Sequence, residues 1–335
     1  MHYPEFKVFV RCFTFNQASY ILDTLNGFTI QKTNFPFICC IVDDASIDGE
    51  QHIIEKYLKD NFNLQDNTIS YNKETDYAQI TFAQHNINTN CFFAVLFLKE
   101  NHYSKKKKKT PYLQTWRNLC SYEAICEGDD YWIDSLKLQK QIDFLEQNPD
   151  YGLIYSKSKV YNQLKSEFEK NTIGKEANSF DELIKHNCIP TLTTCYRKEL
   201  IEKYRREIKV NSSWKMGDYP LWLYISLHSK IKFLDETTTV YRKQEQTASN
   251  FKSMKERLAF LESSSNICSF YSTYANRWDL RNIYKEKYCS IIMSYYITYN
   301  LPIKFSSISK YWLWKPSYVL KYLLSQFSVT RKFLR

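Results

Sequence analysis

The chain has 335 residues, of which 44% are apolar, 24% charged and 17% aromatic, with only six glycines. This length suits one large domain with an appendage or two smaller domains, and the composition is that of an ordinary globular protein. An apolar run such as FFAVLFL (92–98) stops at seven residues, well short of the roughly 18 that span a membrane. The N-terminus, MHYPEFKVFV, lacks the basic-then-apolar layout of a signal peptide. We therefore expect a cytoplasmic protein.

The cysteine spacing bears on disulfide and zinc sites, and the charge distribution shows which part of the chain is basic. The ten cysteines form no Cys-x-x-Cys pair, and Cys39, Cys40 and Cys126 stand in apolar, strand-like runs, which favours buried free thiols over disulfides or zinc. Residues 281–335 hold ten Lys or Arg and one acid, Glu286, so this segment carries +9 of the net +10. The basic character therefore belongs to the C-terminal segment.

The first 60 residues predict two strand–helix units. KVFVRCF (7–13) has strand composition, and Asn16 is expected to cap a helix whose apolar residues recur at helical spacing from Ile21 to Phe28. FPFICCIV (35–42) predicts a second buried strand, which ends at DDASIDG (43–49), and a second amphipathic helix follows. This alternation is typical of an open α/β sheet, which binds ligands at the carboxyl ends of its strands.

Residues 60–120 give weaker signals, and those after 120 are clear again. The run 92–98 fits a strand or a helix, and SKKKKKT (104–110) predicts a solvated loop. Beyond it we expect the following elements in chain order: a strand at 122–126, the acidic turn CEGDDYW (126–132), a helix through Leu136–Leu145, a strand at 151–156, a helix beginning near Asp218 and Pro220, strands at 230–236 and 237–242, and helices after about residue 250.

Paired acids at strand ends call for a chemical explanation. Adjacent ionised carboxylates such as Asp129 and Asp130 repel each other and lose hydration when buried. A divalent cation would offset both costs, since Mg²⁺ and Mn²⁺ take one or two carboxylates together with water and substrate phosphates. A solvated acidic turn is the plain alternative. A second acid pair, Asp43 and Asp44, and an acid at a helix start, Asp218, favour the metal site.

At this point the chain resembles the GT-A-fold glycosyltransferases of family 2, over about residues 6–250. FICCIVDDASIDG is similar to the family's V-D-D-x-S-x-D-G, and GDYPLWL resembles the segment that supplies its catalytic base. CEGDDYWIDSLKLQKQIDFLEQNPDYGLIYS resembles the family's metal-site segment over its whole length. The resemblance implies an α/β GT-A fold, a Rossmann-like mixed sheet flanked by helices, over 1–250, with a helical, basic-aromatic extension at 251–335.

The resemblance also implies roles for individual residues. Asp129 and Asp130 would hold Mn²⁺ or Mg²⁺ against the diphosphate of a nucleotide-sugar, and Asp218 would take the proton of the attacking acceptor hydroxyl in an inverting transfer. The remaining contacts to the nucleotide-sugar would come from the strand ends. Asp44 and Asp43 would bind the nucleotide base, and the turn formed by Phe13, Thr14 and Phe15 would lie along the base and ribose. The family's usual donor is a UDP-sugar and its usual acceptor a saccharide or lipid-linked saccharide in bacterial surface-polysaccharide synthesis.

Two departures and several alternatives stay open. The segment before the metal site is longer than the family's and differs from its G-x-x-x-A-R-N pattern, and Gln244 follows VYR where many members have His. A catalytically silent GT-A scaffold and a nucleotidyltransferase are the alternative functions. The aromatic, basic segment 281–335 suits either an anionic membrane surface or a helical cap on the catalytic domain. No feature resembles a nucleic-acid module.

Overall fold

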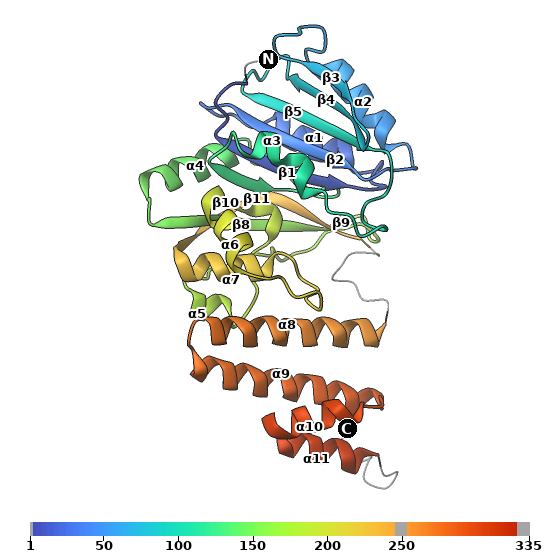
Figure 1. Cartoon of the computed structure of the whole chain (residues 1–335), viewed down its shortest axis with the longest axis vertical. Helices are drawn as coiled ribbons and strands as arrows, with labels where there is room; N and C mark the ends of the chain where they lie inside the picture. Colours follow the sequence, from blue (N-terminus) through green and yellow to red (C-terminus); the bar gives the residue numbers. More distant parts are fainter. Residues whose placement is uncertain (1–2, 245–252, 327–335) are drawn as a thin grey trace.

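The computed structural model describes residues 3–244 and 253–326. One mixed sheet forms the upper part of the molecule, and helices α8 to α11 stack below it (Figure 1). The strands are β1 Val8–Thr14, β2 Phe37–Asp43, β3 Tyr71–Glu74, β4 Ala78–Gln84, β5 Cys91–Leu98, β6 Tyr122–Ile125, β7 Tyr131–Trp132, β8 Tyr151–Asn162, β9 Glu167–Phe168, β10 Cys195–Arg197 and β11 Lys230–Lys243.

The helices alternate with the strands and then continue alone. The α-helices are α1 Ile21–Thr29, α2 Glu50–Asn61, α3 Gln114–Arg117, α4 Lys137–Gln147, α5 Phe180–Leu183, α6 Lys198–Glu207, α7 Tyr219–His228, α8 Met254–Tyr274, α9 Trp278–Tyr299, α10 Phe305–Trp314 and α11 Pro316–Ser325. Two short 3₁₀ helices, η1 Thr110–Leu113 and η2 Thr191–Thr193, complete the described elements. Within the described ranges, no helix is both long and apolar enough to cross a membrane.

The sheet order places the acid-bearing strand ends together. The order is β3-β4-β5-β2-β1-β6-β10-β8-β11-β7, with β9 paired to β8. Strands β5, β2, β1 and β6 run parallel, so the carboxyl ends of β1, β2 and β6 meet at one edge of the sheet. Thr14 at the end of β1 lies opposite Asp43 at the end of β2. The acidic turn follows directly from β6.

Three apolar clusters hold this arrangement. One face of the parallel strands packs on α1, α2 and α4. The other face, to which β4 of the same sheet contributes Ala78, Ile80 and Phe82, packs on the η1–α3 segment. Strands β8 and β10 share a third cluster with α5, α6, α7, α8 and the first turns of α9. The second half of α9 forms a separate cluster with α10, α11 and Leu258 of α8. Helix α8 therefore contributes to both clusters and joins the C-terminal helices to the part of the molecule that contains the sheet.

Most sequence expectations match these elements, and two need correction. The ambiguous run at 92–98 is the buried strand β5, and all ten cysteines are free, nine of them buried. Asn16 is not a helix cap: it adopts a left-handed conformation (φ 54°), its side chain accepts a hydrogen bond from the Ile47 amide, and α1 begins later, at Ile21. The strands expected at 230–236 and 237–242 are one strand, β11, with register shifts between Leu234 and Thr239.

Candidate active site

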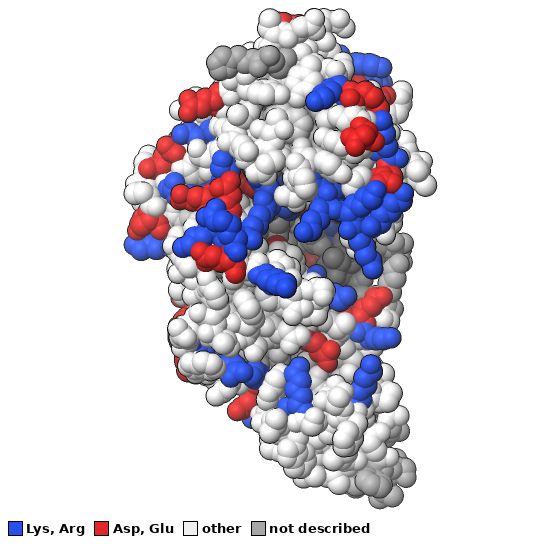
Figure 2. Space-filling model, viewed as in Figure 1, with Lys and Arg blue, Asp and Glu red and all other residues white. Residues whose placement is uncertain are grey.

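A cavity of about 550 Å³ opens beside the carboxyl ends of β1 and β6. It is lined by Arg11, Ile125, Glu127, Asp129, Asp130, Thr191, Gly217, Asp218, Leu221, Trp222 and Tyr241. The structure therefore brings Asp129 and Asp130 from the acidic turn into one cavity with Asp218, although almost 90 residues separate them in the chain. On the face shown in Figure 2, Lys and Arg side chains gather in a band across the middle of the molecule, around a recess.

The acidic turn is held tightly against the end of β1. The Gly128 amide donates to the Phe13 carbonyl at 3.0 Å, and the Thr24 hydroxyl donates to the carbonyls of Gly128 and Asp130 at 3.0 and 2.6 Å. A Cβ on Gly128 would lie 2.1 Å from the Thr14 hydroxyl oxygen, so only glycine permits this approach. The position of the two aspartates is thus fixed by the backbone rather than by long side chains.

Asp130 is the most deeply placed of the cavity acids. Its carboxylate is buried, with 7% of the residue exposed, and Oδ1 accepts a hydrogen bond from the Arg242 amide at 2.8 Å. Burial, and after it the negative charge of Asp129, holds the pKa of Asp130 well above its usual range. The folded protein therefore resists ionising this group.

Asp129 lies beside it in a similar environment. Its Oδ2 accepts from the Gln244 amide group at 3.2 Å, and its backbone carbonyl accepts from the Arg242 guanidinium at 3.0 Å. Burial, and next the negative charge of Glu127, raises the pKa of Asp129 to about 6. Gln244, which replaces the His expected from the resemblance, is thus a direct neighbour of the acid pair.

The oxygen ligands that the cavity offers suit a hard divalent cation that is also bound by the phosphates of a substrate. Asp129 and Asp130 offer carboxylate oxygens, and their raised pKa values show an unfavourable concentration of negative charge that a cation would relieve. Within residues 3–244 and 253–326, no three His, Cys, Asp or Glu side chains form a ready cluster for a metal. Two carboxylates are nonetheless the usual protein share where Mg²⁺ or Mn²⁺ binds through a nucleotide diphosphate.

Asp218 stands on the other side of the cavity, at the start of α7. Its Oδ1 accepts from the Tyr219 amide at 2.8 Å, and Pro220 occupies the first turn, as helix-start chemistry favours. Its Oδ2 accepts from the Thr191 hydroxyl at 2.5 Å. Thr191 and the helix end therefore fix both oxygens of this carboxylate in a single orientation.

The neighbouring strand ends carry the other residues expected to contact the donor. Asp44 is 1% exposed, and its Oδ1 accepts from the His102 amide at 2.7 Å. Its Oδ2 accepts from the Tyr103 amide and the Lys109 ammonium, both at 3.0 Å. We call residues 99–109 the lysine loop. In this structure both oxygens of Asp44 are bonded to the lysine loop.

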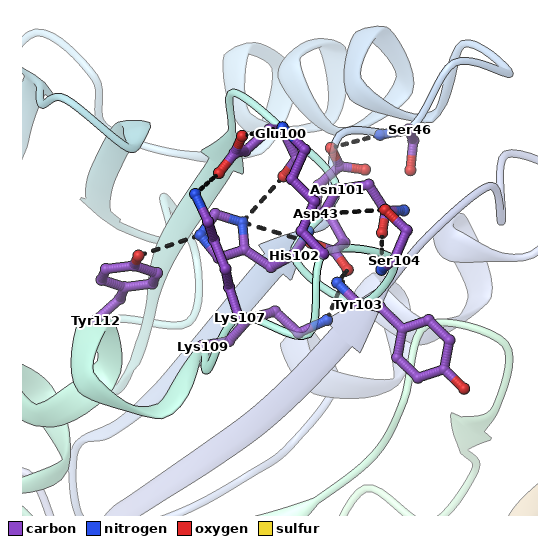
Figure 3. A network of polar contacts seen from close by, with 12 residues as sticks. Asp43, Ser46, Glu100, Asn101, His102, Tyr103, Ser104, Lys107, Lys109 and Tyr112 are labelled. Atoms are coloured by element: carbon purple, nitrogen blue, oxygen red, sulfur yellow. Dashed lines mark hydrogen bonds and ion pairs between the residues drawn. The ribbon is translucent and has the colours of Figure 1, made fainter.

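The lysine loop is itself anchored at several points. Glu100 pairs with Lys105 and Lys107. Figure 3 shows the pair of Glu100 with Lys107 and the His102 ring, which bonds the Tyr112 hydroxyl at 3.1 Å. The Lys109 ammonium also lies 4.8 Å from the centre of the Phe13 ring. The loop that was expected to be merely solvated therefore closes over the ends of β1 and β2.

The remaining expected residues differ in exposure. Asp43 accepts from the Ser46 amide through Oδ1, whereas its buried Oδ2 has no partner among the described residues, and burial raises its pKa. Thr14 is buried and bonds the Glu50 carboxylate, and Phe15 is 41% exposed. Phe13, Thr14, Asp43 and Asp44 thus lie at adjoining strand ends, next to the cavity but not among its lining residues.

Four cavity or near-cavity residues were missed by sequence reasoning: Arg11, Glu127, Thr191 and Arg242. Glu127 accepts from the Phe13 amide at 2.7 Å and pairs with Arg11 at 3.2 Å. A basic residue inside the apolar strand VFVRCFT was the available signal for Arg11. Nothing local marks Thr191 as a partner of Asp218.

The chain has recognisable relatives by sequence. No protein-family model matches the chain. Uncharacterized proteins of Mycobacterium tuberculosis and Mycobacterium bovis are 28% identical over 236 residues, which are 69% of this chain and 57% of theirs. The chain thus spans a little over half the length of these curated relatives.

Solved structures show the likeness more fully. S. aureus TarS 1–349 in complex with UDP-GlcNAc matches with a TM-score of 0.55 at 17% identity, over 98% of this chain and 86% of that one. Mannosyltransferase PcManGT from Pyrobaculum calidifontis, in complex with GDP-Man and Mn²⁺, matches with a TM-score of 0.51 at 10% identity, over 99% and 87%. At these identities the likeness concerns the fold. The protein has the GT-A-like fold of these glycosyltransferases, with a mixed sheet flanked by helices.

Proposed function

We propose that the protein is a metal-dependent, inverting glycosyltransferase that moves a sugar from a nucleotide-sugar, preferably a UDP-sugar, to a saccharide or lipid-linked acceptor. The observation that carries the proposal is the single cavity in which Asp129 and Asp130 accompany Asp218. The structural neighbours were solved with UDP-GlcNAc and with GDP-Man and Mn²⁺, which supports a nucleotide-sugar donor and a divalent metal. Synthesis of a bacterial surface polysaccharide at the inner face of the cell membrane is the setting we propose.

The chemistry assigned to the cavity is a direct displacement. The acceptor hydroxyl attacks the anomeric carbon, its proton passes to Asp218, and the bond from that carbon to the diphosphate breaks with inversion. Asp129 and Asp130 would hold Mn²⁺ or Mg²⁺, which stabilises the negative charge of the leaving diphosphate. Thr191 keeps the Asp218 carboxylate in place through its 2.5 Å hydrogen bond. The surrounding basic side chains favour the approach of an anionic donor.

Donor binding and product identity together test this proposal. With Mn²⁺ present, the correct nucleotide-sugar should raise the melting temperature of the protein, because a ligand that binds only the folded state stabilises it. Incubation with donor and acceptor should then release free UDP. Release of pyrophosphate would indicate a nucleotidyltransferase, and binding without turnover under any acceptor would indicate a silent scaffold.

We further propose that the end of the C-terminal extension docks on an anionic membrane surface. Exposed apolar side chains follow one side of α10 and one side of α11: Phe305, Trp312 and Leu313, then Leu320, Leu323 and Leu324. Lys304, Lys310 and Lys321 accompany them on or beside the same helices. Apolar side chains with neighbouring cations are the chemistry that binds the headgroup region of anionic lipid.

A further inference from the structure

A second cavity lies far from the acid pair, in the C-terminal helices. It has a volume of about 450 Å³ and is lined by Ser290, Ile291, Ser294, Tyr295, Thr298, Tyr299 and Tyr318. The first six belong to α9 and the last to α11, so we call it the α9–α11 groove. In Figure 1 these helices lie at the opposite end of the molecule from the sheet, beyond α8. The groove is therefore separate from the candidate active site.

The lining of the groove has an unusual composition. Six of its seven residues carry a hydroxyl group and none carries a charge. Four of these hydroxyls make no hydrogen bond within the part of the chain that the structure describes, namely those of Tyr295, Thr298, Tyr299 and Tyr318. Ser290 and Ser294 donate to carbonyls one turn earlier in α9, at 2.9 and 2.8 Å, which leaves their oxygens able to accept. The groove thus offers both donors and acceptors.

An aromatic surface accompanies the hydroxyl groups. The Tyr295 and Tyr299 rings are nearly parallel, with an angle of 12° and centroids 5.9 Å apart, and Tyr299 is 52% exposed. The Arg257 guanidinium lies over the Tyr295 ring, 5.0 Å from its centre, and this cation–π contact helps to hold the ring in place. The negative face of an aromatic ring attracts the weakly positive C–H groups of an apolar-faced ligand.

We propose that the α9–α11 groove binds a neutral saccharide. Sugar rings combine many hydroxyl groups with C–H faces, and the groove supplies hydrogen-bonding hydroxyls beside tyrosine rings. No acid lines the groove to select a cation, and six hydroxyl groups are too polar for an acyl chain. Arg257 and Lys321 lie beside the groove but over the rings of Tyr295 and Tyr318, at 5.0 and 5.1 Å from the ring centres, and no Lys or Arg is among the lining residues. The ligand class is therefore an uncharged oligosaccharide.

This inference rests on the proposed function in one respect: it makes the ligand a remote part of the acceptor. A chain held at both the groove and the cavity binds more tightly through the higher effective concentration of its second site. The groove should then lower KM for long saccharide acceptors without changing kcat, and should have no effect on acceptors of one or two units. It lies on the side of α11 that faces α9, whereas Leu320 and Leu324 are exposed, so membrane docking and saccharide binding do not compete for the same side chains.

The test uses the full chain on an array of neutral and acidic oligosaccharides of one to eight units, with no donor present. We expect the intact protein to bind neutral oligosaccharides of several units. Tyr299→Ala should weaken this binding by roughly 3- to 10-fold, the value of one aromatic contact. Phe305→Ala, which removes an aromatic ring that is 86% exposed and outside the groove, is the matched control and should bind as well as the intact protein.

A second pair of variants guards against misfolding. Tyr295→Phe and Tyr318→Phe remove only hydroxyl groups, so they keep the packing and should still weaken binding. Failure of the intact protein to bind any neutral oligosaccharide overturns the proposal, as does binding of acidic members alone or unchanged binding in Tyr299→Ala and both Phe variants. The array needs no turnover, so these outcomes are independent of UDP release, which tests the proposed function itself.

Discussion

Asp130 illustrates how a buried carboxylate can weaken the fold that contains it. Its pKa is raised by burial and by Asp129, so ionisation costs more in the folded than in the unfolded chain. For an acid with a raised pKa, the folded state is favoured at low pH and loses stability as pH rises from the ordinary value of 3.8 to the folded value. Asp129, whose pKa is raised to about 6, adds a loss of its own between its ordinary value and about pH 6. The penalty from the pair then keeps growing until the pH passes the raised pKa of Asp130.

The first prediction follows from this loss of stability with rising pH. Asp130→Asn should abolish sugar transfer, because a neutral amide is a poor ligand for the cation that holds the diphosphate. In EDTA the same variant should melt at a higher temperature than the parent protein, and its advantage should grow between pH 4 and pH 8. Thermal denaturation across this pH range measures the effect. An advantage that is constant or that shrinks with rising pH would contradict the account of the buried charge.

Asp218 carries the second prediction. Asp218→Asn should lower turnover by roughly 10²-fold or more while donor and metal binding stay nearly unchanged, because it removes only the proton acceptor. Thr191→Val should lower kcat by a smaller factor, since it leaves the carboxylate in place but frees one oxygen. Steady-state kinetics with KM and kcat determined separately distinguish these effects. If Asp218 serves only to cap α7, turnover would persist and stability would fall by about 0.3–1 kcal/mol.

Among the structural elements, the lysine loop contacts two of the residues that are expected to bind the nucleotide-sugar. It reaches the end of β2 through Asp44 and the end of β1 through the ring of Phe13. If Lys109 is removed, the buried Asp44 carboxylate keeps its hydrogen bonds to backbone amides, but no positive charge neutralises it. The folded protein is then less stable. The loop therefore depends on Lys109 more than on its other lysines.

The third prediction compares two lysines in that loop. Lys109→Met should destabilise the protein by about 1–3 kcal/mol or more, because about 1–3 kcal/mol is the usual cost of leaving a buried polar group without a partner and a charged group costs more. It should also weaken binding of the nucleotide-sugar. Lys108→Met is the matched control, because Lys108 is exposed and makes no ion pair among the described residues. Equal melting temperatures and equal donor affinities in the two variants would refute a special role for Lys109.

The elements also show what the sequence could and could not predict. Parallel strands β1, β2 and β6 were recognisable from their apolar composition, and each acid pair stood next to a strand end, so the acid-bearing edge was predictable. The contacts of Asp44 with His102 and Lys109 were not, because they join the end of β2 to residues that lie 58 and 65 positions later in the chain. The prediction that Asn16 caps a helix was wrong because short polar side chains such as Asn are favoured both at helix caps and at left-handed backbone positions.

The whole molecule combines a sheet that carries the acids with a helical extension that carries most of the net charge. Figure 2 shows basic side chains around the central recess and a lower end that is largely without charged side chains on that face. The division between the two parts at residue 250 stays a prediction, since α8 shares an apolar cluster with α7 and also contributes Leu258 to the cluster formed by α10, α11 and the second half of α9.

The fourth prediction concerns the exposed apolar side chains of the extension. The intact protein should co-sediment with anionic vesicles at low salt, and the double change Trp312→Ala with Leu313→Ser should reduce that binding. High salt should weaken binding further, because screening reduces attraction to the lysines. Tyr299→Ala serves as a control outside this surface. An intact protein that ignores anionic vesicles at low salt would show that these helices are only structural.

Metal-dependent inversion is best followed by proton NMR of the reaction itself, with an α-linked UDP-sugar, an oligosaccharide acceptor and Mg²⁺, which is diamagnetic and leaves the signals sharp. We expect free UDP and a β-linked product to appear together, EDTA to stop both, and Asp218→Asn to slow both by roughly 10²-fold or more. An α-linked product, release of pyrophosphate, or full activity in EDTA would contradict a metal-dependent, inverting transfer at the cavity of Asp129, Asp130 and Asp218.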